Sequence, residues 1–353
     1  MRKYIKFLIL LAVAILILWF FGRNLDWTQV RSILRSVDPF WLTAAFAVIT
    51  LGYFVRAVRW QVLLKPITPA SLRDLFATTT VGFAAVLIVG RAGEIVRPMW
   101  LPMRDKRVRP SAALATIFVE RVFDLVSLIS IFSLSLIWFK PPPGMEPEFA
   151  SLKLAGNILL AIAVFGVLSL IFYHFKSAML IGWFERVSDR RFVPKRLRAI
   201  FLSLMRQLAA SLNILKSPSG IFWSAFWTLT LWLTIALPTW FVLKAFGLQM
   251  SFFDSTFVMG IASLGSLVPT PGGAAGAFHA ATAGSLILLS VEREQAAAVS
   301  IIMHLVYFAP AVVFGLYYLF HGDISVERFR SLLSSENAER EIESDSPDFE
   351  PEG

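Results

Sequence analysis

Three charged residues lie near the middle of a long apolar run. Glu120, Arg121 and Asp124 are the only ionisable side chains between Ser111 and Phe139. At about 1.5 Å of rise per helical residue, they would lie roughly 15 Å from the nearer end of the run. A charge at that depth in a bilayer costs about 2.5–3.5 kcal/mol and is rarely retained unless it faces a polar cavity and has partners. This segment is therefore the first candidate for a functional site.

The spacing of these charges supplies partners on one helical stripe. Glu120 and Asp124 are separated by four positions and Arg121 and Asp124 by three, which are the spacings of neighbours on a helix surface. We expect the three side chains to form an intramembrane polar core that serves transport. The alternative is a structural salt bridge that only fixes helix packing.

A glycine-rich segment precedes this run and carries arginine. Gly90 and Gly93 permit a tight helix break. Arg91, Glu94 and Arg97 follow at intervals of three, on one side of the next helix. Because arginine binds phosphate in a bidentate manner, these three residues are candidates for contact with a lipid headgroup.

Further upstream, an arginine pair ends an apolar run. Arg56 and Arg59 are additional headgroup candidates, and Trp60 follows directly. Arginine and tryptophan ordinarily mark a membrane interface. For Arg59 and Trp60 the sequence favours such an interface anchor.

A second break lies in the other half of the chain. Pro269 and Pro271 would end the preceding helix, and Gly272, Gly273 and Gly276 permit backbone that other residues rarely adopt. The freed amides at the start of the next helix could bind an anion. We expect Gly272 and Gly273 to contact the headgroup and the other three residues to act as hinges, as Gly90 and Gly93 do in the first break.

His279 follows this second break. The sequence places it in the first turn of the next helix, where it could contact a headgroup or relay a proton. The alternative role is a helix-packing hydrogen-bond donor.

Composition restricts the class of protein that must position these residues. The 353 residues are 57% hydrophobic, and the mean hydropathy is +0.68. The apolar residues come in long uncharged runs, which predicts an all-α polytopic membrane protein. No cysteine is present, and the four histidines lack metal-site spacing, so we expect no metal and no cofactor.

Hydrophobic runs predict about six full spans and two broken re-entrant hairpins. The expected spans are residues 5–22, 38–62, 111–139, 152–173, 219–245 and 295–320. The expected hairpins are residues 71–89 with 91–103 and residues 251–268 with 276–291. Broken backbone at membrane depth is tolerated only where protein buries it or water reaches it.

Charge in the loops predicts the orientation. The net charge is +9, and residues 174–217 form a basic amphipathic segment that we expect on the cytoplasmic leaflet. The start of the chain has the layout of an uncleaved signal anchor, so both termini are expected in the cytoplasm. Residues 323–353 contain ten acidic and three basic residues, which predicts a disordered tail after a membrane domain of residues 1–322. The first hairpin would then open to the cytoplasm and the second to the outside.

The two hairpins also resemble each other. An offset of 180 residues pairs Asp74 with Asp254 and Gly93 with Gly273. A span, a broken hairpin and a span would then recur in opposite orientation. Transporters with inverted repeats place their substrate site between such discontinuous segments.

Four motifs, taken in order and spacing, resemble a known family. They are Arg56-x-x-Arg59-Trp60, Gly90-Arg91-x-Gly93-Glu94-x-x-Arg97-Pro98, Glu120-Arg121-x-x-Asp124 and Pro269-x-Pro271-Gly272-Gly273. Together they are similar to the flippase-like transmembrane domain family, also called the lysylphosphatidylglycerol synthase transmembrane region or the UPF0104 membrane proteins. The resemblance covers about residues 5–322 and implies a lipid-flipping protein of the cell inner membrane. Many members continue Pro-Gly-Gly-x-Gly-x-x-Glu, whereas this chain has Ala275 and then Gly276-Ala277-Phe278-His279, so the role of that glutamate is not transferred.

These observations lead to one principal hypothesis, a lipid translocase that moves an anionic phospholipid or a related lipid across the cytoplasmic membrane. Its partners would be membrane lipids and not nucleic acid. The chain ends about thirty residues past its last expected span, so we expect no soluble synthase domain and no enzyme activity. Two alternatives are a membrane enzyme that modifies a lipid headgroup or lipid-linked sugar, and a membrane partner of a separate lipid-modifying enzyme.

Overall fold

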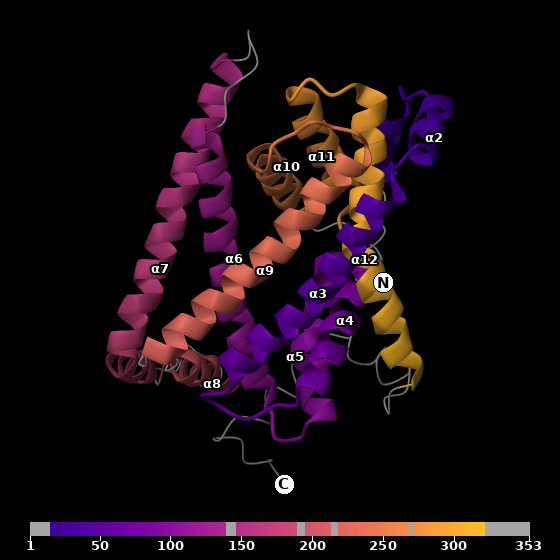
Figure 1. Ribbon diagram of the computed structural model, residues 1–353. Coiled ribbons are helices and arrows are strands. Elements are labelled where there is room, and N and C mark those ends of the chain that lie inside the picture. Colours follow the sequence, from indigo (N-terminus) through magenta and orange to yellow (C-terminus); the bar gives the residue numbers. More distant parts are fainter. Residues whose placement is uncertain (1–14, 139–145, 189–194, 213–217, 269–271, 322–353) are drawn as a thin grey trace.

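The chain folds into a bundle of long helices that is interrupted by two broken hairpins (Figure 1). The computed structural model describes residues 15–138, 146–188, 195–212, 218–268 and 272–321. Within these ranges the regular elements are helices, and no strand occurs. The prediction of an all-α membrane protein is confirmed. The expected span at residues 5–22 and the acidic tail fall largely or wholly outside the described residues.

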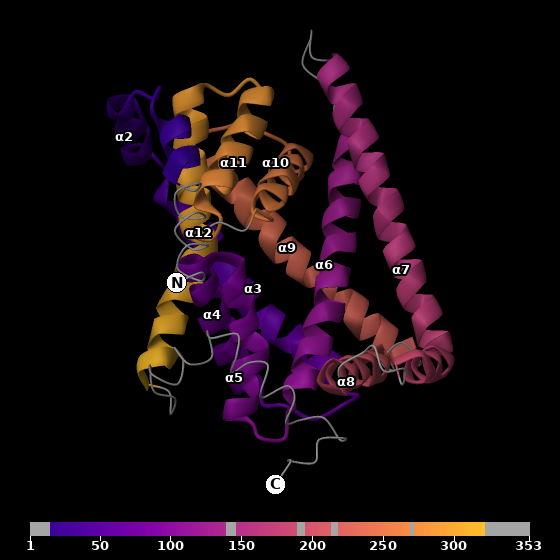
Figure 2. The same cartoon turned by 180° about the vertical axis from the view of Figure 1, so that it is seen from behind.

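Within the described part of the chain, four helices are long and apolar enough to cross a bilayer. They comprise α3 (Pro39–Leu64), residues Phe149–Ser188 of α7 (Glu146–Ser188), α9 (Pro218–Ala245) and α12 (Arg293–His321). The charged α6 (Pro110–Trp138) is 29 residues long, which corresponds to roughly 43 Å at about 1.5 Å per residue. It runs beside α7 through the depth of the bundle in both views (Figure 2).

The first hairpin breaks where the glycines predict it. Helix α4 (Leu72–Val89) ends at Gly90, whose φ of 68° is in the left-handed region. A 3-10 segment, η1 (Gly90–Ile95), then leads into the short α5 (Val96–Arg104). The break places Glu94 in η1 and Arg97 at the start of α5.

The second hairpin consists of α10 (Phe252–Gly265) and α11 (Ala275–Leu288). A capping box fixes the start of α10: the Ser251 hydroxyl accepts from the Asp254 amide, and the Asp254 carboxylate accepts from the Ser251 amide. Pro269 and Pro271 lie outside the described residues. The break itself is visible in Gly272 and Gly273, with φ values of 75° and 63°.

The two halves of the bundle repeat one order of elements. Helix α3, the α4 hairpin and α6 are followed later by α9, the α10 hairpin and α12. The helix starts are offset by similar distances: Pro218 follows Pro39 by 179 positions, Phe252 follows Leu72 by 180, and Arg293 follows Pro110 by 183. The N-caps of α4 and α10, Ser71 and Ser251, are also 180 positions apart.

Equivalent helices of the two halves also pack on each other in a reciprocal way. Helix α3 packs along α9, while α4 of the first half packs on α12 and α10 of the second half packs on α6. Glycine permits two of these close helix contacts. A Cβ on Gly52 of α3 would lie 2.8 Å from Thr234 Oγ1 of α9. A Cβ on Gly315 of α12 would lie 2.9 Å from the Thr80 carbonyl oxygen of α4. The α4–α5 hairpin and the α10–α11 hairpin lie at opposite ends of the bundle in both views (Figures 1 and 2). This arrangement is the one expected of an inverted repeat.

Helix α7 differs from the sequence prediction. The expected span ended at residue 173, but α7 continues without interruption to Ser188 and includes the beginning of the basic segment. Lys176 and Arg186 therefore extend a transmembrane helix and do not begin a new one. The remaining part of the segment is α8 (Lys195–Leu212), which lies across one end of α6 and α7 (Figure 2).

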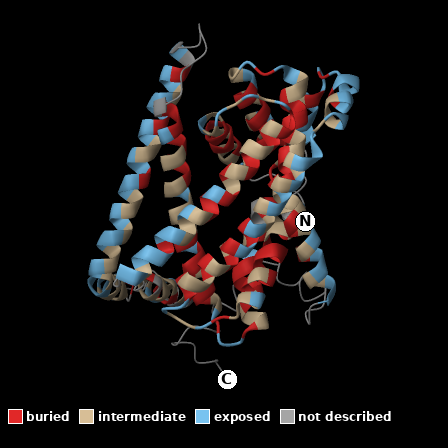
Figure 3. Cartoon of the chain, in the orientation of Figure 1, coloured by how far each residue is buried: buried red, intermediate tan, exposed pale blue. Residues whose placement is uncertain are grey.

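Burial is concentrated around the two repeats (Figure 3). Helices α3, α4, α11 and α12 share a core that includes Tyr53, Phe278 and Met303. Helix α7 instead exposes Phe165, Phe172 and other large apolar side chains along its length. An apolar face of this kind is compatible with contact to lipid chains.

Candidate functional site

The charges predicted from the sequence meet at the junction of α3, α5 and α6. Arg59, Arg97 and Glu120 are 1%, 2% and 0% exposed. Arg97 forms a bidentate pair with Glu120, with Nη1–Oε1 and Nη2–Oε2 distances of 2.8 and 3.1 Å. The short helix α5 is thereby joined to the middle of α6 by two charge-assisted hydrogen bonds.

Asp124, one turn further along α6, pairs with α3. Arg59 Nη1 donates to Asp124 Oδ1 at 2.6 Å, and Arg59 Nη2 lies 3.5 Å from Glu120 Oε1. Arg121 bridges the two carboxylates, with Nη2 2.7 Å from Glu120 Oε1 and 3.2 Å from Asp124 Oδ2. Each buried carboxylate is therefore held by at least two guanidinium groups.

Arg59 and Trp60 do not anchor the protein at a membrane interface. Both are buried inside the bundle, where Arg59 belongs to the ion-pair cluster. The Trp60 indole Nε1–H donates to Thr116 Oγ1 at 3.0 Å, and the Arg97 guanidinium lies 4.6 Å from the centre of its ring. The interface prediction was wrong because the end of α3 packs against α6, and Trp60 shares a buried apolar cluster with Leu101 of α5.

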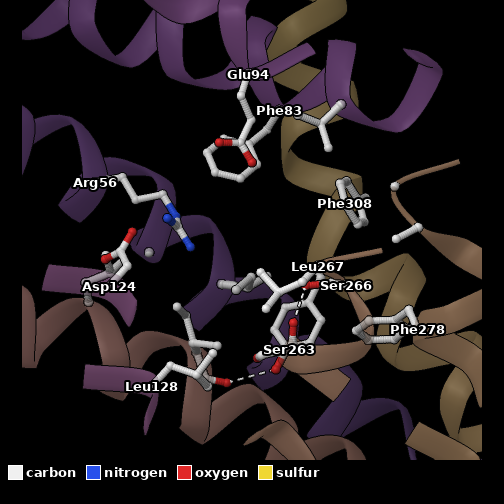
Figure 4. Close-up of a pocket in the computed structure, with 18 of the residues that line it drawn as sticks. Arg56, Phe83, Glu94, Asp124, Leu128, Ser263, Ser266, Leu267, Phe278 and Phe308 are labelled. Carbon is white, nitrogen blue, oxygen red and sulfur yellow. Dashed lines mark hydrogen bonds between the residues drawn. The ribbon is translucent and has the colours of Figure 1, made fainter. Parts of the chain in front are cut away.

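A cavity of about 360 Å³ lies beside this cluster, between the two hairpins (Figure 4). Arg56, Glu94, Arg121 and Asp124 line its charged end. Its wall is otherwise mostly apolar and includes residues of α3, α4, α6, α9 and α12. In Figure 4, Arg56 extends into this space with Asp124 at its side.

The second hairpin supplies the opposite wall. Ser263 and Ser266 at the end of α10, Gly273 in the break and Phe278 of α11 all line the cavity. Figure 4 shows Ser263 and Phe278 on the side away from Arg56. Both helix breaks predicted from the sequence thus border one space.

The predicted site residues divide into two groups. Those that line the cavity are Arg56, Glu94, Arg121, Asp124 and Gly273, whereas Arg59, Arg97, Glu120, Gly272 and His279 are not among its lining residues. The side chain of Arg91 lies outside the described part of the structure. The structure therefore brings the charged residues together but places only some of them at the cavity wall.

Arg56 differs from the other arginines of the site. It is half-buried, and among the described residues no carboxylate lies within 4.0 Å of it. Its guanidinium lies 4.8 Å from the centre of the Phe83 ring instead. The four arginines at positions 56, 59, 97 and 121 face three carboxylates at positions 94, 120 and 124. The described groups of the cluster and the cavity together therefore have one more arginine than carboxylates, whereas the four that line the cavity, Arg56, Glu94, Arg121 and Asp124, are balanced.

Glycine allows the first break to approach α4 closely. A Cβ on Gly93 would lie 2.4 Å from the Val86 nitrogen and 2.7 Å from the Ala85 carbonyl oxygen. A Cβ on Gly82 would lie 2.3 Å from Arg97 Cγ. The first contact folds η1 back onto α4, and the second lets Arg97 pass over α4 on its way to Glu120.

The sequence predicted His279 in the first turn of its helix, but the structure places it later in α11. The helix begins at Ala275, because Ala274 takes a left-handed conformation with φ of 62°, so His279 falls in the second turn. Its ring lies 5.0 Å from that of His304 on α12. Gly276 lies buried in the first turn of α11 and not in the break itself.

Several lining residues were not predicted from the sequence. Tyr53, Phe83, Ser263 and Tyr307 carry no motif, and their types are common in any membrane helix. A helical-face argument could have found Tyr53 and Arg56, since a spacing of three residues places them on one face of α3. His304 had no signal, because only the folded structure brings it to the second break.

Comparison with known proteins agrees with the resemblance seen in the motifs. The model of the family described as the lysylphosphatidylglycerol synthase TM region matches residues 7–315. The chain belongs to this family. A curated relative, a UPF0104 membrane protein of Methanothermobacter thermautotrophicus strain Delta H, is 22% identical over 259 residues, which is 69% of this chain and 75% of the relative.

For this member of the lysylphosphatidylglycerol synthase TM region family, the match covers both repeats and therefore the whole cavity. Membership and the long apolar helices together establish a multi-pass membrane protein with a lipid-related context. Among the described residues, no group of three or more His, Asp or Glu side chains is arranged to hold a metal ion.

Proposed function

We propose that the protein is a lipid translocase that moves an anionic phospholipid, or a related lipid, between the leaflets of the cytoplasmic membrane. One observation carries this proposal. A cavity with mostly apolar walls, and with Arg56 unpaired by any described carboxylate at its charged end, lies between two broken hairpins that enter the bundle from opposite ends. These are the properties needed to hold an amphiphile during passage across a bilayer.

Arg56 would contact the lipid phosphate first. It extends into the cavity and has no carboxylate partner among the described residues, so a phosphate would give its guanidinium a bidentate acceptor. Arg121 lines the same end and pairs with both carboxylates at once, with Nη2 2.7 Å from Glu120 Oε1 and 3.2 Å from Asp124 Oδ2. It would supply the second contact when one of these bonds opens.

Arg59 and Arg97 would position the site without touching the lipid. Their guanidinium groups are occupied by Asp124 and Glu120 and are almost fully buried. The network they form fixes α6 relative to α3 and α5. It thereby holds Arg121 and Asp124 at the cavity wall.

The apolar part of the cavity would hold the acyl chains next to the headgroup. Leu128, Leu231 and Phe278 contribute to this wall from three different helices. The two breaks would permit alternating access, because each hairpin can move at its glycine turn while the long helices stay packed. This reading favours transport over an enzyme, since the Glu120 oxygens are already engaged by Arg97 and Arg121 and are poorly placed to act as a base.

A leaflet assay tests this proposal. The purified protein would be reconstituted into liposomes that contain fluorescent phosphatidylglycerol, and an impermeant quencher would report the outer-leaflet fraction over time. We expect this lipid to move several-fold faster in liposomes that contain the wild-type protein than in protein-free liposomes. Equal rates with and without protein would rule out translocase activity.

A further inference from the structure

Two buried histidines meet beside the second break. His279 of α11 and His304 of α12 are 9% and 8% exposed, and their ring centres are 5.0 Å apart. They are separated by 24 intervening residues in the sequence and come together because α11 packs on α12. The ion-pair cluster and the charged end of the cavity do not use either of them.

The hydrogen bonding of the pair is incomplete. His304 Nε2 lies 3.4 Å from the carbonyl oxygen of Gly273. His279 Nδ1 is buried and has no hydrogen-bond partner among the described residues. A buried, unpaired ring nitrogen is costly unless it can gain a partner or a proton in another state.

The surroundings of the pair are aromatic and uncharged. Phe21 stacks on His279 at 6.3 Å, Phe278 contacts both imidazoles, and Phe308 lies 4.9 Å from His304. Besides these rings, His279 has His304 and the backbone of Ser300 as polar neighbours. Tyr307 is a further titratable group of α12; its ring contacts Phe278, and its hydroxyl donates to the Ile235 carbonyl of α9.

Other ionisable groups on the neighbouring helices are engaged elsewhere. Asp254 caps the start of α10, Lys244 of α9 lies over Trp240, and Arg56 of α3 lies over Phe83. Among the residues that the structure describes, no Asp or Glu forms an ion pair with either histidine. The pair is suited to take up a proton in one state of the cycle and release it in another.

The pair is connected to the cavity through Gly273. This residue lines the cavity, adopts a φ of 63°, and would place a Cβ only 2.6 Å from Phe308. A neutral imidazole has one donor and one acceptor, whereas a protonated imidazole has two donors. Protonation would change what His304 and His279 offer to the Gly273 carbonyl and to each other, and hence the conformation of the break.

We propose that His279 and His304 form a proton-binding site through which lipid movement is coupled to proton movement. The inference rests on the proposed translocase function. It adds a second transported species, the proton, and assigns it to the second hairpin. Histidine is suited to this role because its ordinary pKa of about 6.5 lies within the physiological pH range.

A gradient experiment tests the coupling. Liposomes containing the wild-type protein and labelled phosphatidylglycerol would receive a transmembrane pH gradient, with the membrane potential clamped by potassium and valinomycin. For one proton per lipid, a gradient of one pH unit should change the final ratio of labelled lipid between leaflets about tenfold. An entrapped pH dye should report proton movement that depends on the lipid.

Variants then locate the proton site. H279F and H304F retain an aromatic ring among aromatic neighbours and remove the titratable nitrogens, and H279Q and H304Q retain a donor. We expect all four variants to move lipid down its gradient and to lose the response to pH. The matched control H321Q, which changes an exposed histidine at the end of α12, should respond as the wild type does.

Two results would overturn the inference while leaving the translocase function intact. One is wild-type lipid movement that is insensitive to the pH gradient, and the other is an unchanged response in both H279F and H304F. If the wild type moved no lipid under any gradient, the proposed function and the proton site would both fail. Thermal unfolding of each variant in detergent identifies the substitutions that are folded and can be compared.

Discussion

Glu120 and Arg56 have opposite roles within one charged cluster. Glu120 is fully buried, accepts from Arg97 and Arg121 and lies 3.5 Å from Arg59 Nη2, so it connects α3, α5 and α6. Arg56 has no carboxylate partner among the described residues and extends into the cavity. The stability of the fold should therefore depend mainly on Glu120, and lipid recognition should depend mainly on Arg56.

The substitution Glu120→Gln should destabilise the protein strongly. It leaves Arg97 without its charged partner, and removal of one member of a buried pair costs about 3–5 kcal/mol. The melting temperature in detergent should fall well below that of the wild type. Glu185→Gln is the matched control, since Glu185 pairs with Arg206 at the surface and exposed pairs contribute little, and its melting temperature should change much less. Equal effects of the two substitutions would contradict the structural role of Glu120.

The sequence predicted these charges but not their partners. Spacing along α6 indicated pairs between Glu120, Arg121 and Asp124, and the Arg121 contacts confirm part of that pattern. The stronger pairs join residues 23 and 65 positions apart, Arg97 with Glu120 and Arg59 with Asp124. Pairing at such separations depends on how the helices pack, and no local pattern contains that information.

Among the helices, the two glycine breaks determine the shape of the cavity. Residue Gly93 brings η1 against α4, and the turn at Gly272 and Gly273 redirects the chain into α11. Glycine is required at position 93 because the backbone of α4 approaches closely, and at positions 272 and 273 because the backbone is left-handed there.

A methyl group at Gly93 should disturb the first hairpin. Its Cβ would lie 2.4 Å from a backbone nitrogen of α4, which cannot move as a side chain can, so Gly93→Ala should cost about 1–3 kcal/mol and lower transport. The control is Gly166→Ala in the middle of α7, where a Cβ meets nothing within 4 Å and helix propensity favours alanine. Measuring the free energy of unfolding of Gly93→Ala and of Gly166→Ala against the wild type tests this prediction. A neutral Gly93→Ala would show that η1 does not need its close contact with α4.

Element boundaries could be predicted at the breaks but not at the end of α7. Proline and glycine act on the local backbone, so the breaks near residues 90 and 273 are visible in the sequence. The extension of α7 to Ser188 is supported by its contacts with α8, and Tyr173 donates to the Met205 carbonyl at 2.7 Å. The basic residues after position 175 hid this continuity, since they resemble the end of a span.

The whole molecule is organised as two halves that exchange hairpins. Each hairpin packs on the last long helix of the other half, and the cavity lies where the two breaks approach each other. The 180-residue offset was visible in Asp74, Asp254, Gly93 and Gly273, because a repeat leaves a trace in the sequence. The cavity was not visible, because its wall is assembled from six or more helices whose lining residues have ordinary types.

The native chain contains no cysteine, so introduced cysteines can report the orientation of each hairpin without a background. Lys106 follows the first hairpin and Glu292 follows the second, and both are exposed. In intact cells, an impermeant maleimide should label E292C, whereas K106C should react only after permeabilisation. The same accessibility at both positions would contradict hairpins that open to opposite sides.

The central claim is that lipid passes through the cavity, and the leaflet assay with Arg56→Ala tests it most directly. Loss of a charge-assisted hydrogen bond of about 1.5–3 kcal/mol should lower the rate of phosphatidylglycerol movement about tenfold or more. The control Arg206→Ala removes an exposed arginine of α8 that pairs with Glu185 at 2.8 Å, and it should leave the rate within about twofold of the wild type. An Arg56→Ala protein that is folded and moves the lipid as fast as the wild type would contradict the account.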